Sequence, residues 1–107
     1  MVKRKGIRSV SKEELHLYIK QLDHNDPEAR YWAVVYLEQA ADPESVPALI
    51  QALSSQDLYL RGGAAKALAA IGAAARDAIP ALTECLKHED AWVCKSAEYA
   101  LEKIRGE

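Results

Sequence analysis

Hydrophobic residues recur along the chain at the spacing of amphipathic helices. Leu15, Ile19 and Leu22 share one face of the first such segment, and the segments SVPALIQAL and AIPALTECL show the same spacing further along. No segment alternates apolar and polar residues between turn signals in the way that a half-buried strand does. The pattern therefore predicts an all-α chain.

Capping residues place the boundaries of these helices. Ser11 and Glu14 form a capping box, with Val10 and Leu15 as its hydrophobic staple, so we expect the first helix to start at Ser11. Other residues are typical of helix ends: Asp26, Asp42, Asp57 and Asp90 as caps, Pro27 and Pro43 at first helical positions, and Gly72 and Gly106 at C-terminal ends. These boundaries give six helices, which we interpret as three hairpins.

The same helix pair occurs three times. The second helices align as DPEARYWAVVYLEQA from Asp26, DLYLRGGAAKALAAI from Asp57 and DAWVCKSAEYALEKI from Asp90, at offsets of 31 and 33 residues. The first helices ELHLYIKQL, SVPALIQAL and AIPALTECL align at the same offsets. Because whole hairpins repeat, we expect one repeat domain at 11–107, with repeats of about 11–41, 42–72 and 73–107 after a flexible basic tail at 1–10.

The second helices share the pattern Asp-x-x-apolar-Arg-x-x-Ala-x-x-x-Leu, and two first helices contain VPAL or IPAL. The pattern is complete twice: at Asp26, Ala29, Arg30, Ala33 and Leu37, and at Asp57, Leu60, Arg61, Ala64 and Leu68. Over residues 11–105 the sequence resembles HEAT repeats, in particular the short HEAT-like repeats of phycobilisome lyases. The resemblance implies an α-solenoid of three stacked hairpins whose second helices line the concave side. Cys94 stands at the arginine position of the last repeat, so we expect an Asp–Arg ladder between repeats to stop there.

Stacked hairpins would bury their leucines, with small alanines between them. A chain of 107 residues is long enough for one modest core of this kind. We expect the core to contain Leu15, Ile19, Leu22, Leu37, Leu49, Leu53, Leu68, Leu82, Leu86 and Leu101.

The exposed positions of the second helices form a candidate binding face. Transferred from the resemblance, they are Glu28, Tyr31, Trp32, Val35 and Gln39, then Tyr59, Gly62, Gly63, Lys66 and Ala70, then Trp92, Lys95, Ser96, Tyr99 and Lys103. Five of the seven aromatic residues are in this set. The alternative is that some rings, such as those of Trp32 and Tyr36, pack between helices. Exposed aromatic side chains are typical of protein-binding surfaces, which favours a functional face.

Gly62 and Gly63 are unusual inside a helix, because each glycine costs about 1 kcal/mol relative to alanine. They align with Tyr31 and Trp32 in the first repeat and with Lys95 and Ser96 in the last. One interpretation is a notch in the face that admits a side chain of a partner or an apolar small molecule. The other is close packing of helix backbones. The two adjacent glycines favour the notch.

Composition and charge narrow the functional classes. Half of the residues are hydrophobic and 28% are charged, and no apolar run approaches the roughly 20 residues of a membrane span. Two cysteines and an N-terminus without an apolar signal-peptide centre favour the cytoplasm. The formal charge is −2, to which Lys3, Arg4, Lys5 and Arg8 contribute +4, so the other residues carry −6. An acidic body disfavours binding to a phosphate backbone, and we interpret the basic tail as solvated.

Catalytic and metal chemistry find little support in the sequence. Cys85, His88, Glu89 and Cys94 include a zinc-like Cys-x-x-His spacing, but no second pair completes four ligands. Iron-binding HEAT-like hydroxylases carry His-Glu pairs after the arginine of second helices, and this chain has none there. A phosphate-binding glycine loop and a nucleophile arrangement are also missing, and His16, His24 and His88 look like surface residues. We expect no catalytic residue, metal or cofactor.

The sequence therefore favours a non-enzymatic adaptor or scaffold that binds a protein segment on the face of its second helices. The residues expected to bind are Tyr31, Trp32, Val35, Tyr59, Gly62, Gly63, Lys66, Trp92, Lys95 and Tyr99. An accessory role in a chromophore lyase-like system is suggested by the resemblance alone. Nucleic-acid binding through the tail with Lys66, Lys95 and Lys103 ranks third. We expect no membrane partner, and a monomer or weak homo-oligomer.

Overall fold

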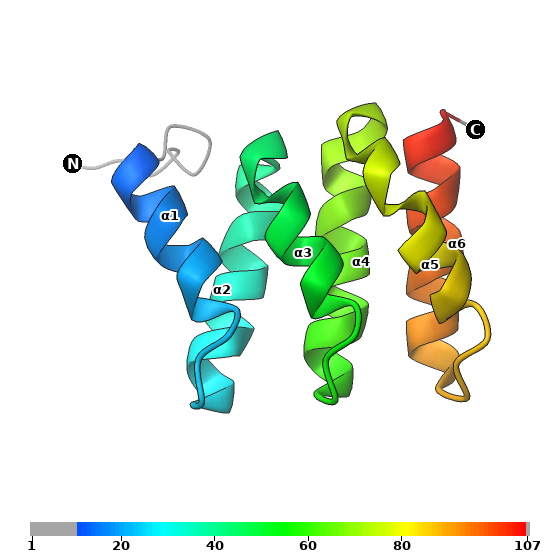
Figure 1. Cartoon of the computed structure of the whole chain (residues 1–107), viewed down its shortest axis with the longest axis horizontal. Coiled ribbons are helices and arrows are strands. Elements are labelled where there is room, and N and C mark those ends of the chain that lie inside the picture. The colour runs from blue at the N-terminus through cyan, green and yellow to red at the C-terminus, as the bar shows by residue number, and fades with distance from the viewer. Residues whose placement is uncertain (1–10, 107) are drawn as a thin grey trace.

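Three helical hairpins make up residues 11–106, the part of the chain that the computed structural model describes (Figure 1). The described residues form six α-helices and two short 3-10 helices: α1 (Lys12–Gln21), α2 (Pro27–Ala40), η2 (Pro43–Ser45), α3 (Val46–Ala52), α4 (Leu58–Ile71), η3 (Gly72–Ala78), α5 (Ile79–Cys85) and α6 (Ala91–Arg105). The all-α solenoid predicted from the repeats is confirmed.

The helix ends follow the capping chemistry predicted from the sequence. The Ser11 hydroxyl accepts a hydrogen bond from Glu14 N, and the Glu14 carboxylate accepts one from Ser11 N. The predicted caps also accept bonds from first-turn backbone N–H groups: Asp26, Asp42, Asp57 and Asp90. Gly72 and Gly106 end their helices with positive φ angles of 77° and 82°. Val10, the other half of the expected staple, lies outside the described residues, as does the basic tail.

Two first helices begin with a 3-10 helix instead of a regular α-helical turn. Pro47 and Pro80 are the second residues of α3 and α5, and proline has no N–H to donate to the fourth residue before it. Val46 N instead donates to Pro43 O, and Ile79 N to Arg76 O, which are the shorter 3-10 bonds. Asp42 therefore caps η2, and α3 follows directly.

The helices lie in two layers, with α1, α3 and α5 in front of α2, α4 and α6 in Figure 1. The described residues extend over 44 × 32 × 19 Å, and the shortest extent matches about two helix diameters. The second helices α2, α4 and α6 pack directly against one another. All three loops within the hairpins lie at one end of the molecule, at the bottom of Figure 1. No helix in residues 11–106 is long and apolar enough to cross a bilayer.

The core lies between the two layers and contains most of the predicted residues. Eight predicted leucines are buried: Leu15, Leu22, Leu37, Leu49, Leu53, Leu68, Leu82 and Leu101. Ile19 is half-buried against them. Leu86 is 38% exposed, so its predicted burial is wrong. Its equivalents Leu22 and Leu53 each have another hairpin stacked beside them, whereas Leu86 belongs to the last hairpin described.

Candidate interaction face

Four aromatic side chains from three helices form a continuous row. We call Trp32, Tyr31, Tyr59 and Trp92 the aromatic row. Its ring centroids lie 4.8 Å apart between Trp32 and Tyr31, 4.9 Å between Tyr31 and Tyr59, and 5.7 Å between Tyr59 and Trp92. These separations are typical of favourable aromatic pairs. Each ring side chain is 39–53% exposed, so the row is a surface feature supported by contacts between its own members.

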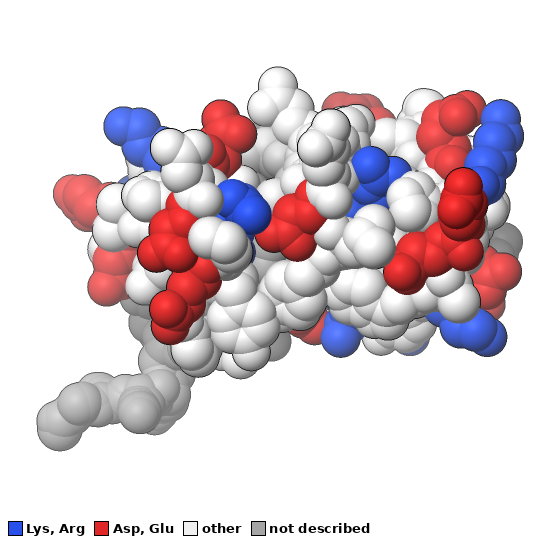
Figure 2. Space-filling view, turned by 90° about the horizontal axis from the view of Figure 1, so that it is seen from below, with Lys and Arg blue, Asp and Glu red and all other residues white. Residues whose placement is uncertain are grey.

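The hairpin geometry brings these rings together. Tyr59 and Trp92 are each the second residue of their helices, α4 and α6, and Tyr31 lies in the second turn of α2. Because α2, α4 and α6 all begin at the same end of the molecule, their first turns lie side by side. Figure 2 looks onto that end and shows uncharged surface running across the view, with acidic and basic groups above it and basic groups with some acidic ones along its lower edge. The row therefore joins all three hairpins.

Gly62 and Gly63 do not form an open notch, so that expectation is wrong. Both residues are buried. A Cβ atom on Gly63 would lie 2.5 Å from Cγ1 of Val34 in α2, and a Cβ atom on Gly62 would overlap the indole ring of Trp92. The space beside each glycine is thus filled by a side chain of a neighbouring helix. Close packing, the alternative interpretation, explains both residues.

The remaining predicted face residues differ in exposure. We use the name second-helix face for the surface that α2, α4 and α6 turn away from the first helices. Lys66, Lys95 and Tyr99 are exposed there, and the ammonium of Lys103 lies 5.5 Å from the centroid of the Tyr99 ring. Val35 is half-buried. Ser96 was expected to be exposed but is buried, because it occupies the position of Gly63 in the last hairpin.

Burial is the main cause that raises the pKa of Tyr59 above its ordinary value. The neighbouring Tyr31 phenol and the carboxylate of Glu38 raise this pKa further. Tyr59 therefore keeps its proton and remains a hydrogen-bond donor in neutral solution.

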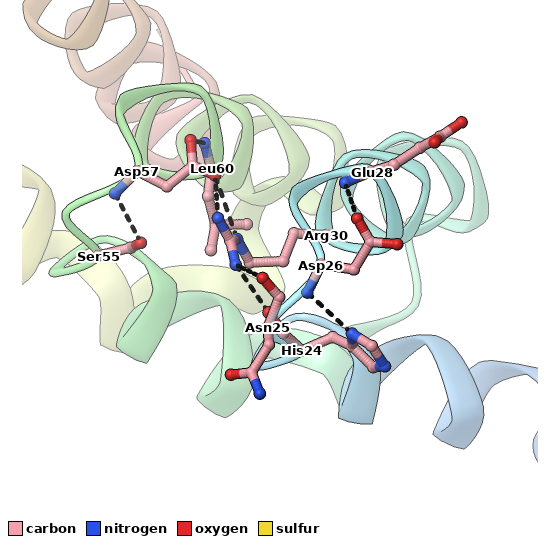
Figure 3. Close-up of polar contacts among 8 residues, drawn as sticks. All are labelled: His24, Asn25, Asp26, Glu28, Arg30, Ser55, Asp57 and Leu60. Carbon is pink, nitrogen blue, oxygen red and sulfur yellow. Dashed lines mark hydrogen bonds and ion pairs between the residues drawn. The ribbon is translucent and has the colours of Figure 1, made fainter.

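An ion pair between Arg30 and Asp57 links the first two hairpins (Figure 3). Arg30 donates to Asp57 Oδ2 through Nε at 3.1 Å and Nη2 at 2.9 Å, and both side chains are only about one-fifth exposed. Nη1 of Arg30 also donates to the carbonyls of His24 and Asn25 in its own loop. His24 in turn accepts from Asp26 N, the backbone of the cap residue. Arg30 therefore holds its own loop and the next hairpin together.

The other hairpins keep the loop contact but lack the ion pair. Arg61 Nε donates to Ser55 O at 2.9 Å, and Cys94 Sγ donates to His88 O at 2.8 Å, the carbonyls equivalent to that of His24. Among the described residues, Arg61 forms no ion pair with Asp90. The Asp–Arg ladder was expected to stop at Cys94, but it has a single rung and stops one repeat earlier.

One recurring contact was missed in the sequence. His24, Ser55 and His88 each stand two residues before a capping aspartate and accept a hydrogen bond from its backbone N–H at 3.0 Å. The sequence signal for this contact was a side chain able to accept a hydrogen bond two residues before the capping aspartate in all three repeats. These side chains shape the loops, and two of the three histidines are used in this way.

The cysteines near the last loop are engaged with backbone carbonyls. Cys85 is buried, and burial raises the pKa of its thiol, which favours the unreactive protonated form. Cys94 points toward the carbonyls of Leu86 and His88. Within the described residues, no group of three histidine, cysteine or acidic side chains has an arrangement suited to a metal ion.

A family model described as HEAT repeats matches residues 16–102. Two crystal structures of engineered proteins from the Northeast Structural Genomics Consortium are similar in fold. One has a TM-score of 0.77 and 27% identity over 95% of this chain, and the other has 0.76 and 28% over 94%. The matches cover 50% and 30% of those two proteins, so the chain spans half their length or less. A search of curated proteins gave no match.

Proposed function

The chain belongs to the HEAT-repeat family, and we propose that it is a cytoplasmic, non-enzymatic module that binds a segment of a partner protein on its second-helix face. HEAT-repeat proteins are generally interaction scaffolds. Residues 11–107 would act as one domain of three repeats. The aromatic row is the observation that carries the proposal, because it offers a partner four exposed rings across all three hairpins.

The row has the properties of an efficient binding surface. Tryptophan and tyrosine dominate the binding energy of many protein interfaces, since their rings present large contact areas with few rotatable bonds. Here each ring also packs against another ring, and Trp92 fills the space over Gly62. Rings already held in place lose little conformational entropy when a partner binds. Tyr99 and the lysines extend this surface along α4 and α6.

Selection from an unbiased library of short peptides tests this proposal. Peptides of about twelve residues would be selected on the folded protein, and their affinities measured for Trp32→Ala and for Leu17→Ala. Both residues are about half exposed, but Leu17 lies on α1, away from the row, which makes Leu17→Ala a matched control. We expect Trp32→Ala to lower affinity about tenfold and Leu17→Ala to change it less than twofold.

Equal losses in the two variants, or no change in either, would place binding elsewhere and contradict the proposal. The chromophore role suggested by the resemblance to phycobilisome lyases has its own readout. A bilin absorbance change on mixing, absent in the Trp32→Ala variant, would replace the protein segment by a chromophore as the occupant of this face.

A further inference from the structure

We infer that the occupant of the second-helix face is an acidic protein segment, with aspartate or glutamate side chains spaced between apolar ones. The inference rests on the proposed function and adds the chemistry of the partner. It starts from a contrast in charge. Residues 11–106 contain ten lysine and arginine residues against fifteen aspartate and glutamate residues, yet three of the four charged residues at the predicted face positions are lysines: Lys66, Lys95 and Lys103, against Glu28.

Three lysines follow the row on α4 and α6. Lys95 is one helical turn after Trp92, and Lys66 is two turns after Tyr59 on the same side of α4. Lys103 lies over Tyr99 one turn further along. Among the described residues, the lysine ion pairs are those of Lys12 and Lys87, both on other elements. The three ammonium groups of this face are therefore free to bind carboxylates.

The rings themselves favour an acceptor-rich partner. Tyr59 and Trp92 are stacked with 15° between their planes, so each ring covers part of the other, and both side chains remain about 40% exposed. The edge of an aromatic ring is its positive region, which attracts carboxylate oxygens. The atoms of Trp92 that fill the space over Gly62 belong to the benzene side of the indole, opposite Nε1.

Two exposed acidic side chains of α6, Glu98 and Glu102, border this face, and Glu98 lies one helical turn after Lys95. Glu98 and Glu102 occupy the positions that Ala65 and Ala69 hold in α4, where both alanines are buried. In the last hairpin described, the same positions are exposed at the end of the stack. At the predicted face positions Glu28 at the start of α2 is the acidic residue, and the carboxylate of Glu38, also on α2, lies close enough to raise the pKa of Tyr59. The basic character of the face therefore increases from α2 toward α6.

A short acidic segment fits this surface better than a nucleic acid. Phosphate backbones are bound by many cations along a continuous track, whereas this face has three lysines and no arginine at its predicted positions. The five exposed aromatic side chains of the face match apolar residues between the carboxylates. An extended segment that crosses α2, α4 and α6 along the row can reach both groups.

Tryptophan fluorescence gives a direct test, because the only two tryptophans, Trp32 and Trp92, both belong to the row. The probes are peptides of about twelve residues built from Glu-Gly-Leu, Gln-Gly-Leu or Lys-Gly-Leu repeats, and an oligothymidylate of similar length. Each is titrated into the full chain and into Lys66→Glu, Lys95→Glu and Lys20→Glu. Lys20 is an exposed lysine of α1, so Lys20→Glu is a control with the same change of charge.

We expect the glutamate peptide to bind about tenfold more tightly than the glutamine and lysine peptides. Lys66→Glu or Lys95→Glu should remove that preference, and Lys20→Glu should retain it. Equal binding of the glutamate and glutamine peptides would overturn the inference but leave the proposed function standing. Tighter binding of oligothymidylate, or no binding of the glutamate peptide, would also overturn it. Library-selected peptides that need Trp32 for binding but carry neutral or positive charge would show that the face binds a partner without requiring an acidic one. The proposed function would then stand, and the inference of an acidic partner would fail.

Discussion

The two joints between hairpins solve the same packing problem with different side chains. We call the contact of α2 with α4 the first joint and the contact of α4 with α6 the second joint. In the first joint Val34 fills the space beside Gly63, whereas the equivalent residues of the second joint are Ala65 and Ser96, both buried. The first joint therefore pairs a large residue with glycine, and the second joint has two small residues at the equivalent positions.

A second exchange takes place at the surface. Tyr31 lies against Tyr59 in the first joint, and the equivalent residues of the second joint are Gly62 and Trp92. Two rings of similar size are replaced by the smallest residue and the largest. Equivalent backbones can therefore stack at both joints although these two pairs of side chains differ, because the volume lost on one helix is supplied by the other.

The joints also differ in polarity. The first contains the partly buried Arg30–Asp57 pair, and the second has no equivalent pair among the described residues. Burial by itself raises the pKa of Asp57, but hydrogen bonds from Arg30 and from the backbone of α4 hold it below its ordinary value. The first joint should thus be more sensitive to mutation and to acid than the second.

Gly63→Ala should have the largest effect on stability. The added methyl group would lie 2.5 Å from Val34 Cγ1, and the stiff valine side chain is fully buried, so we expect a loss of about 1–3 kcal/mol despite the better helix propensity of alanine. Adding Val34→Ala to Gly63→Ala should recover part of this loss of stability, since the double variant then has two small residues at these positions, as the second joint does. Urea unfolding of both single variants and the double variant measures the coupling. Strictly additive losses would contradict the packing account.

Replacing Arg30 or Arg61 should have the next largest effect on stability. Arg30→Ala removes the ion pair and two bonds to loop carbonyls, with an expected cost of about 1–3 kcal/mol. Arg61→Ala removes one loop bond and should cost about 1 kcal/mol, and Lys66→Ala should be within about 0.5 kcal/mol of the wild type. Urea midpoints of the three variants give the order. An Arg61→Ala loss as large as that of Arg30→Ala would show that the joints do not differ in this way.

Acid should weaken the first joint selectively. The folded-state pKa of Asp57 is lowered, so its contribution is complete above about pH 4 and is lost as the pH falls through the folded pKa, below the ordinary value of 3.8. Asp57→Asn should therefore cost about 1 kcal/mol at neutral pH and converge with the wild type at lower pH. Asp90→Asn is the matched control, because Asp90 caps α6 without an arginine partner in the described residues. A pH-independent loss for Asp57→Asn would argue against the ion pair.

Gly62→Ala should have the smallest effect on stability. Its methyl group meets the indole of Trp92, which is 40% exposed and can move outward, and the gain in helix propensity of about 1 kcal/mol offsets the disturbance. We expect a net change below about 1 kcal/mol and an altered tryptophan emission. A loss equal to that of Gly63→Ala would mean that Trp92 is held as rigidly as the core.

A feature could be predicted from the sequence where the residues that determine it are close to one another along the chain. The caps at Ser11, Asp26 and Asp90 depend on neighbours within a few positions. Tyr31, Tyr59 and Trp92, whose exposure was transferred from the resemblance to HEAT-like repeats, are exposed. The side chain that fills the space beside Gly62 or Gly63 belongs to another hairpin, so the sequence around the glycine did not reveal it. The errors at Leu86 and at the Asp–Arg ladder have the same cause, because both features depend on the neighbouring hairpin in the stack.

Mapping of peptide-induced chemical shifts tests the central claim most directly. A library-selected peptide is added to the isotopically labelled protein, and the two indole N–H signals, from Trp32 and Trp92, are followed together with the backbone amides. Binding to the aromatic row predicts shifts of both indole signals and of amides in α4 and α6, with α1 and α5 unchanged. Shifts confined to α1, α3 and α5, with both indole signals fixed, would contradict binding on the second-helix face.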